Sequence, residues 1–249
     1  MDVVVATGAE YGLKINWDKV DMMAVRCHPQ VTCSRGVDME QKSSLTYLGA
    51  LLDESGRIHS ELSRRLGMAT ADYKALAAVW GHANVSHQAK YRIYMACIAA
   101  KLLYGLQSAW LTQVQRKKLD AFHARCLRKI LRVPHSYYSR VSNKTVLGMV
   151  HSFPLSRFLL EQQLLLFGKI YRRPLEDVSR RLVFNGPSDE LRISTFKRAR
   201  GRPRLNWAAE VRAHAVEAAG TTSRLRESLG DHDAWRKIVR AYSRNSGPT

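Results

Sequence analysis

The residues best suited to a chemical role are the cations of segment 116–132, which reads R-K-K-L-D-A-F-H-A-R-C-L-R-K-I-L-R. At a helical spacing of roughly 100° per residue, five apolar side chains share one face: Leu119, Phe122, Cys126, Leu127 and Ile130. The cations fall on the other face, within an arc of roughly 120°: Lys117, Lys118, Arg125, Arg128, Lys129 and Arg132. A single acidic residue, Asp120, lies between the two faces. A solvated helix face usually mixes its charges, so this pattern favours a phosphate-contacting surface over a merely soluble face.

The charge of the whole chain also indicates an anionic partner. Forty Lys and Arg against twenty-one Asp and Glu give the 249 residues a formal net charge of +19, which is typical of proteins that bind nucleic acid or another anionic surface. No apolar run is long enough to span a membrane, and the N-terminus has neither the basic region nor the cleavage site of a secretory signal. We therefore expect an intracellular protein, nuclear or cytoplasmic, with no membrane partner. The sequence does not indicate an oligomeric state.

A second basic stretch, K-R-A-R-G-R-P-R at residues 197–204, contains an AT-hook-like core. Two arginines that flank a glycine can lie flat in a narrow minor groove, because glycine lets the backbone approach closely. A single copy of this pattern favours a flexible basic linker over a minor-groove element, and in either case the arginines add to phosphate binding. The arginines concerned are Arg200, Arg202 and Arg204.

Two tyrosines are candidates for stacking on bases. Tyr137 and Tyr138 follow Pro134, where we expect a loop, and Arg140 lies close in sequence. Exposed rings beside cations are typical of single-strand binding. The other aromatic candidates lie in apolar stripes and are expected in the core: Trp80, Trp110 and Trp235.

Patterns for catalysis and metal binding are scarce. The acidic pairs at 53–54, 176–177 and 189–190 lie at turns or helix ends, where we expect solvated carboxylates rather than a two-metal site. Cys27, His28 and Cys33 lack a second ligand pair at zinc spacing. We expect reduced thiols and no metal site in the chain.

The periodicity predicts a mainly α fold. Lys19–Arg26 and Leu45–Leu52 are expected to form two strands at the edge of a sheet whose other strands are missing, because two strands alone are marginal. From Ile58 the period is helical, and we expect six helices, over 62–80, 88–110, 116–132 (ended by Pro134), 154–170, between Asn206 and Gly220, and over 235–242. Ser86 and Asn206 are predicted N-caps. The expected parts are a small two-stranded β segment (1–57), a helical bundle (58–184) and a basic linker with C-terminal helices (185–249).

Several segments, in this order, resemble the C-terminal part of the reverse transcriptases of non-LTR (LINE-type) retrotransposons. Gly12-Leu13-Lys14-Ile15-Asn16 with Lys19 resembles motif D, written G-L-x-I-N-x-x-K-T, and Tyr47-Leu48-Gly49 resembles motif E, the primer-grip hairpin. The bundle from Ile58 is similar to the thumb, with Lys90, Leu103-Tyr104-Gly105, Trp110 and the helix around Phe122 and Arg125-Cys126-Leu127-Arg128. Gly201-Arg202-Pro203 with Trp207, and Trp235-Arg236, resemble the downstream segment. The sequence departs from the family at Val20, where threonine is usual, and at Gly168-Lys169, where Gly-His is frequent.

The resemblance implies the end of a palm over 1–57, a thumb over 58–184, and an RNA-directed DNA polymerase as the parent activity. The family's metal-binding aspartates lie in an F/Y-x-D-D motif upstream of motif D, whereas only Asp2 occurs among the eleven residues before Gly12. We therefore expect no autonomous synthesis and no catalytic residue here, with Lys19 a vestige of the motif D general acid. Mg²⁺ is expected only for an intact polymerase, which would include an upstream palm segment.

The expected retained function is binding of template–primer nucleic acid, namely RNA–DNA hybrid, duplex DNA or RNA. Two alternatives remain open. One is a non-enzymatic DNA- or RNA-binding module with an AT-hook-like tail. The other is an inert relic whose helices do not fold alone.

Overall fold

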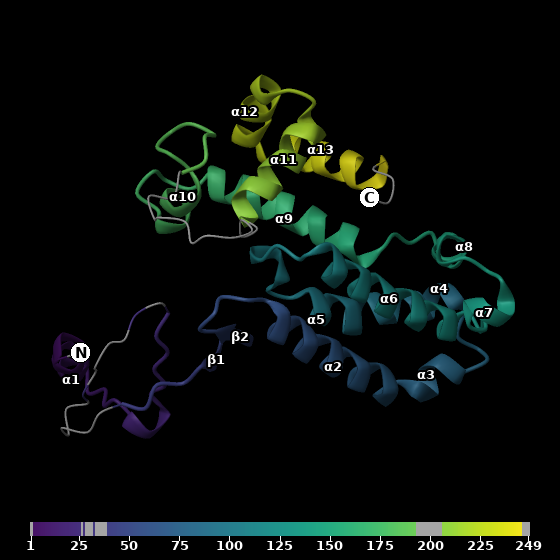
Figure 1. Cartoon of the computed structure of the whole chain (residues 1–249), viewed down its shortest axis with the longest axis horizontal. Coiled ribbons are helices and arrows are strands. Elements are labelled where there is room, and N and C mark those ends of the chain that lie inside the picture. Colours follow the sequence, from purple (N-terminus) through teal and green to yellow (C-terminus); the bar gives the residue numbers. More distant parts are fainter. Residues whose placement is uncertain (1, 26, 28–31, 33–38, 193–205, 246–249) are drawn as a thin grey trace. The chain divides into compact units, whose positions relative to one another are not determined.

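The computed structural model describes residues 2–25, 27, 32, 39–192 and 206–245. These residues are mainly helical, with one two-stranded sheet among them (Figure 1), so the predicted fold class is confirmed. The chain divides into two compact units, residues 1–64 and 65–249. This division falls a few residues after the boundary predicted at 57/58.

The N-terminal unit begins with a helix, α1 (Asp2–Glu10), where no element was expected. A short 3-10 segment, η1 (Trp17–Lys19), follows it. The strand predicted over 19–26 is wrong, because only Met22 among its described residues forms a bridge, and that bridge is isolated. The side chain of Asn16 accepts a hydrogen bond from the amide of Asp18 (3.2 Å), and such a local turn competes with an extended strand.

The strand predicted over 45–52 is a hairpin instead. β1 (Ser44–Tyr47) pairs antiparallel with β2 (Ala50–Asp53). The two turn residues have φ values of +48° at Leu48 and +79° at Gly49, and positive φ at both positions matches the twist of the flanking strands. Residue types alone do not indicate the turn, because leucine is not a turn-forming residue, but a hairpin at Tyr47-Leu48-Gly49 is what the resemblance to motif E implied.

The first two turns of α2 (His59–Ala75) hold this hairpin. The carboxylate of Glu61 accepts from the amide of Leu51 (3.0 Å), and the guanidinium of Arg64 donates to the carbonyl of Gly49 (2.8 Å). Glu61 is buried, and its charge is paired with Arg64 (2.8 Å).

Two helices predicted as continuous are interrupted. The helix expected over 62–80 becomes α2 and α3 (Ala77–Gly81), with a break at Leu76. The helix expected over 88–110 becomes four consecutive segments: α4 (His87–Tyr94), the π-helical η2 (Met95–Ala99), α5 (Ala100–Leu103) and the 3-10 segment η3 (Leu106–Ser108). Gly105 has φ +77°, a left-handed conformation that ends a helix at low cost only for glycine. The predicted N-cap at Ser86 is confirmed by a hydrogen bond from the amide of Ala89 (3.2 Å).

The predicted cationic helix is α6 (Gln113–Ile130), and hydrogen bonds fix both of its ends. Thr112 and Gln115 form a capping box at the N-terminus. At the C-terminus Arg132 adopts φ +56°, and the amide of Val133 donates to the carbonyl of Arg128 (2.9 Å), as in a Schellman motif. The helix therefore ends before Pro134 is reached.

Four helices follow: α7 (Ser136–Ser139), α8 (Asn143–Met149), α9 (Leu155–Tyr171) and α10 (Val178–Val183). Only α9 was predicted, and its bounds agree with the apolar run from 154 to 170. The C-terminal helices are α11 (Trp207–Ala219), α12 (Thr222–Gly230) and α13 (His232–Asn245). The predicted N-cap at Asn206 and helix end at Gly220 are confirmed, whereas α12 was missed.

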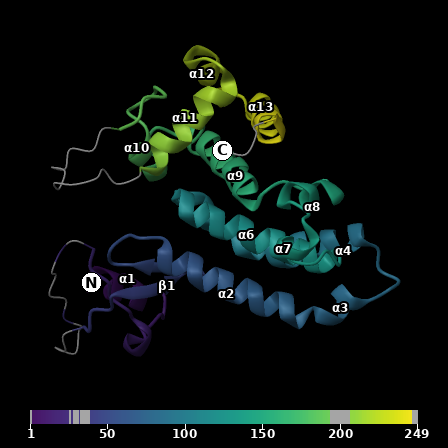
Figure 2. The same ribbon diagram turned by 45° about the vertical axis from the view of Figure 1, so that its right-hand side comes forward.

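Helix α9 joins the two groups of helices in the C-terminal unit. It packs against α6 on one side and against α11 and α13 on the other (Figures 1 and 2). Phe167, Phe184 and Trp235 belong to one buried cluster, so this core runs across the boundary predicted at 184/185.

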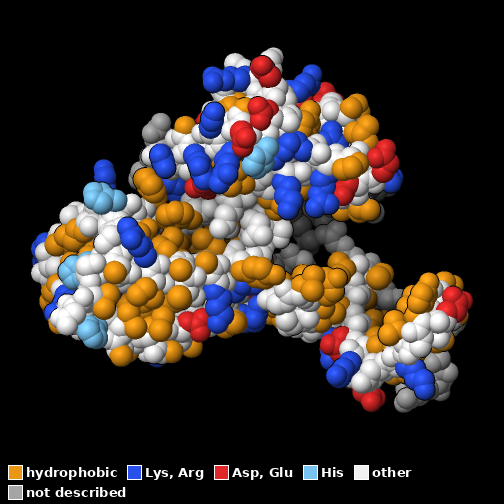
Figure 3. Space-filling model, turned by 180° about the vertical axis from the view of Figure 1, so that it is seen from behind, with side chains coloured by type: hydrophobic (Ala, Val, Ile, Leu, Met, Phe, Trp, Pro, Cys, Tyr) orange, Lys and Arg blue, Asp and Glu red, His pale blue; other side chains and the backbone are white. Residues whose placement is uncertain are grey.

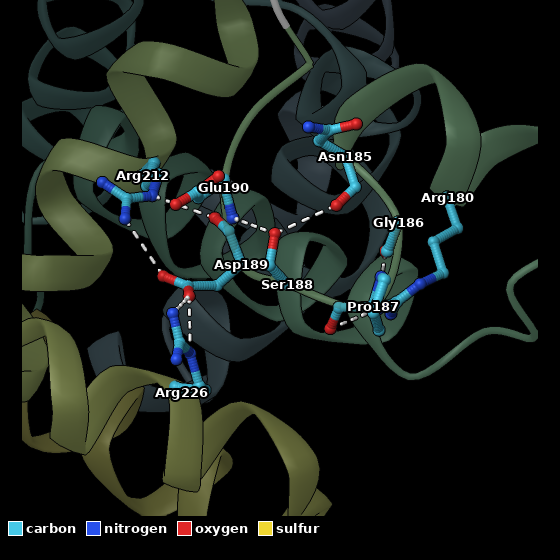
Figure 4. A network of polar contacts seen from close by, with 9 residues as sticks. All are labelled: Arg180, Asn185, Gly186, Pro187, Ser188, Asp189, Glu190, Arg212 and Arg226. Carbon is cyan, nitrogen blue, oxygen red and sulfur yellow. Dashed lines mark hydrogen bonds and ion pairs between the residues drawn. The ribbon is translucent and has the colours of Figure 1, made fainter.

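In the acidic pair at 189–190, Glu190 is exposed as expected, whereas Asp189 is not a solvated carboxylate. Asp189 is fully buried between two arginines from the C-terminal helices (Figure 4). Its carboxylate lies 2.7 Å from Arg226 and 3.0 Å from Arg212. Burial alone would raise the pKa of Asp189, but the hydrogen bonds from the two arginines outweigh it, and the pKa is lowered. This carboxylate therefore ties the loop after α10 to α11 and α12.

Candidate nucleic-acid interface

All the charged side chains on the exposed face of α6 are positive. Lys117, Lys118, Arg125 and Lys129 are exposed there, and Arg132 follows just past the helix end. The opposite face is buried, as the apolar stripe predicted: Leu119, Phe122, Cys126, Leu127 and Ile130 are each at most 4% exposed. The predicted two-faced arrangement of this helix is thus present in the structure.

Arg128 is the exception among the predicted phosphate-binding residues, because it is buried (7% exposed). Its guanidinium donates to the carbonyls of Pro134 (2.9 Å) and Val141 (2.6 Å) and to the side chain of Asn143 (2.9 Å). These bonds hold the segment around α7 against α6. We therefore leave Arg128 out of the interface, whose cationic face is Lys117, Lys118, Arg125, Lys129 and Arg132.

Acidic side chains do not offset this face. Residues 65–150 contain fourteen Lys and Arg but only two acidic residues, Asp72 and Asp120. Asp72 is paired with Lys101 (2.8 Å). Asp120 is directed at the start of α9, where it accepts from the amide (2.8 Å) and the hydroxyl (2.7 Å) of Ser156. Burial raises the pKa of Asp120, although the bonds from Ser156 oppose the shift.

A buried polar chain fixes α6 against α4 and the turn before α9. His123 is fully buried, with Nδ1 2.9 Å from the hydroxyl of Tyr94 and Nε2 3.2 Å from the hydroxyl of Ser152. Tyr91 donates to the same serine hydroxyl (2.9 Å). Burial lowers the pKa of His123 to about 4, so the imidazole is neutral at physiological pH and its role is structural.

Tyr137 and Tyr138 lie just beyond the C-terminal end of the cationic face. They are in the short helix α7, not in a loop as predicted, and are 67% and 79% exposed. Their rings meet edge to face at 5.3 Å, and the guanidinium of Arg140 lies 5.5 Å from the ring of Tyr137. Exposed rings beside an unopposed cation retain the geometry that base stacking needs.

Trp80 and Trp235 are buried, as expected, whereas Trp110 is only partly buried and has the guanidinium of Arg116 4.0 Å above its ring. Cys126 is buried, and burial raises the pKa of its thiol to about 12. Cys97 is exposed.

The other predicted site residues are not brought to this face. Arg200, Arg202 and Arg204 lie outside the described residues. Lys19 is exposed in η1, and Tyr47 and Leu48 are exposed at the hairpin turn with Gly49, all in the N-terminal unit. Within the described ranges, no group of three or more His, Cys, Asp or Glu side chains is placed to hold a metal ion.

A second cationic row, which was not predicted, lies on α13. Arg236, Arg240 and Arg244 recur every four residues, and all three are exposed. The spacing is readable in the sequence, but only the apolar stripe around Trp235 and the pair Trp235-Arg236 entered the prediction for this helix. In Figure 3, blue side chains form a row along the lower edge of the upper part of the C-terminal unit, beside orange ones.

No family model matches the sequence, and no curated protein or solved structure shows significant similarity to it. None of the helices in the described part of the chain is both long and apolar enough to cross a membrane.

Proposed function

We propose that this chain binds nucleic-acid duplex of the template–primer type along α6, as the thumb-like part of a non-LTR retrotransposon reverse transcriptase. The observation that carries the proposal is the cationic face of α6, which is exposed while the two acidic residues of segment 65–150 are engaged elsewhere. An uncompensated face of this kind attracts phosphates and releases their counterions.

The shape of the face favours a duplex. Its cations run from Lys117 to Arg132, which corresponds to about 22 Å along a helix axis, or about six base pairs at 3.4 Å each. A straight row of this length matches the rod-like backbone of a duplex better than a compact anion. The two exposed tyrosines of α7 lie where the end of a duplex or an unpaired base would meet them.

Binding, not synthesis, is the function proposed for these residues. Polymerisation requires two metal ions held by carboxylates, and no F/Y-x-D-D motif occurs in the 249 residues. Synthesis would therefore belong to a protein that includes those aspartates, and Lys19 has no role in the proposed binding.

The test is fluorescence anisotropy of the chain with a labelled RNA–DNA hybrid, compared with duplex DNA of mixed sequence and with A·T-rich duplex DNA. We expect the hybrid to bind at least as tightly as either DNA. Reversing two charges of the face, Lys118→Glu with Arg125→Glu, should weaken hybrid binding roughly tenfold or more.

A matched control is Arg181→Glu with Arg224→Glu, which reverses the charge of two exposed arginines on α10 and α12. The change in log K for the hybrid should be less than half of that in the α6 double variant. Equal losses in both double variants would refute the α6 face as the interface. An A·T-rich preference that disappears with Arg200→Ala and Arg202→Ala would favour the AT-hook-like module instead.

A further inference from the structure

An open groove of about 960 Å³ lies in the C-terminal unit, between the end of α5, helix α9 and the start of α13. Its volume is within the range of ligand sites, roughly 300–1,000 Å³. Its lining combines apolar and aromatic side chains, Ala100, Tyr104, Leu165 and Leu166, with cationic ones, Lys169, Arg172, Arg173 and Arg236. His232 and the fully buried Trp235 also border the groove. Gln107 and Gln162 complete the lining, and none of these residues is acidic.

Only some of these cations are available to a ligand. Arg172 donates to the carbonyl of Leu229 (3.0 Å), and Arg173 is paired with Asp177 (2.9 Å). Lys169 and Arg236 are exposed and have no ion-pair partner among the described residues. They come from two different helices, α9 and α13, so the groove has a cation on each of these two walls.

The cationic row continues beyond the groove along α13. Arg236, Arg240 and Arg244 follow one another every four residues, which is about 6 Å per step along the helix axis. A small anion would be held by a compact cluster, whereas a row of this kind fits a linear polyanion.

The uncharged side chains that line the groove favour a single strand over a duplex as the polyanion. Two partly buried leucines offer apolar surface, and Tyr104, which is 57% exposed and has the guanidinium of Arg65 5.3 Å from its ring centroid, offers aromatic surface. In a duplex the ring faces of the bases are covered by stacking on neighbouring base pairs. A duplex would therefore present only its phosphates to the apolar and aromatic side chains of the groove. Unpaired bases can stack on an aromatic ring while their phosphates contact cations, and the two glutamine amides supply donors and acceptors for base edges.

We propose that this groove binds single-stranded nucleic acid, with phosphates on Lys169 and the Arg236–Arg244 row and an unpaired base against Tyr104. The inference adds a second site of a different ligand class to the duplex-binding face proposed for α6. It does not depend on that face, because the groove and the α6 face share no residue.

The experiment measures the affinity of the full chain for a labelled single strand, oligo(dT) of about twenty nucleotides, and for a duplex of equal length. In the variant Lys169→Glu with Arg236→Glu, single-strand affinity should fall roughly tenfold and the slope of log K against log[salt] should flatten by about 1.4, at about 0.7 per contact on single strands. Duplex affinity should fall no more than in the control Arg181→Glu with Arg224→Glu.

Tyr104 provides the second measurement. Tyr104→Ala should weaken single-strand binding roughly five- to tenfold, since one stacked base is lost, and Tyr104→Phe should restore it because the phenyl ring can still stack. Circular dichroism and a cooperative thermal melt establish that each variant folds.

The outcomes separate the two proposals. Single-strand binding that is unchanged in both groove variants, or equally weakened in the control, overturns the groove. Loss of duplex binding in the α6 variant, with single-strand binding intact, supports both sites. Loss of both ligands in the groove variant alone overturns the division into two sites.

Discussion

Gly168 shows how a single residue sets the packing of the last helix. A Cβ atom at this position of α9 would lie 2.3 Å from Cδ1 of Trp235, closer than any real contact. The indole is fully buried against this glycine, and its Nε1 donates to the carbonyl of Leu164 (2.9 Å). α13 can therefore approach α9 only because residue 168 has no side chain.

Gly168→Ala should lower the free energy of unfolding by roughly 1–3 kcal/mol, as overpacking of a core does, although alanine favours a helix. Gly67→Ala is the matched control, because Gly67 lies within α2 with nothing within 4 Å of an added Cβ. It should leave stability unchanged or raise it by up to about 1 kcal/mol. Urea denaturation measures both, and a stabilised Gly168→Ala variant would contradict this packing.

His123 makes the stability of the fold depend on pH. Its pKa is lowered from 6.5 to about 4 by burial, so below neutral pH the unfolded chain binds a proton that the folded chain does not. Stability from this residue is therefore fully present above about pH 6.5 and is lost as pH falls toward 4.

Between about pH 7.5 and pH 5, this residue should lower the free energy of unfolding by about 2 kcal/mol. His123→Gln removes the titrating group, so its stability should fall less over the same interval even though the variant starts from a lower value. Parallel stability profiles for the two proteins would show that the imidazole is not buried in the neutral form.

At the scale of elements, α6 contains two arginines that look alike in the sequence but have different environments in the structure. Arg125 is exposed, whereas Arg128 satisfies three oxygen acceptors around α7. Arg128→Met should cost roughly 1–3 kcal/mol of stability, because buried acceptors lose their donor. Arg125→Met should change stability by less than about 0.5 kcal/mol and instead flatten the salt dependence of duplex binding by about 0.9. Chemical denaturation and anisotropy of both variants test this distinction. A stability loss in Arg125→Met together with a flatter salt dependence in Arg128→Met would contradict it.

Helices of this chain are readable from the sequence where one face repeats over several turns. α6, α9, α11 and α13 follow such stripes, and their ends agree with residues that cap or terminate helices, such as Asn206 and Gly220. The short helices α7, α8 and α10 have too few turns to show a period. The hairpin at Leu48 and Gly49 and the π-helical segment η2 depend on backbone geometry that residue types do not announce.

At the scale of the whole molecule, the cationic character of the candidate site is predictable from the sequence, but the exact set of residues that form it is not. Counting charges finds α6, and helical spacing places its cations on one face. Burial of Arg128 and the engagement of Asp120 at the start of α9 depend on tertiary contacts with residues up to 36 positions away. The α9–α13 groove likewise exists only because segments from three parts of the chain meet.

The central claim is that the cations of α6 contact the phosphates of a duplex, and the salt dependence of binding tests it most directly. The slope of log K against log[salt] should be about 1.8 flatter for Lys118→Gln with Arg125→Gln than for the unmodified chain, since each lost phosphate contact removes about 0.9 on duplex DNA. Arg181→Gln with Arg224→Gln should leave the slope unchanged. A slope in the α6 variant that equals that of the unmodified chain would contradict the account.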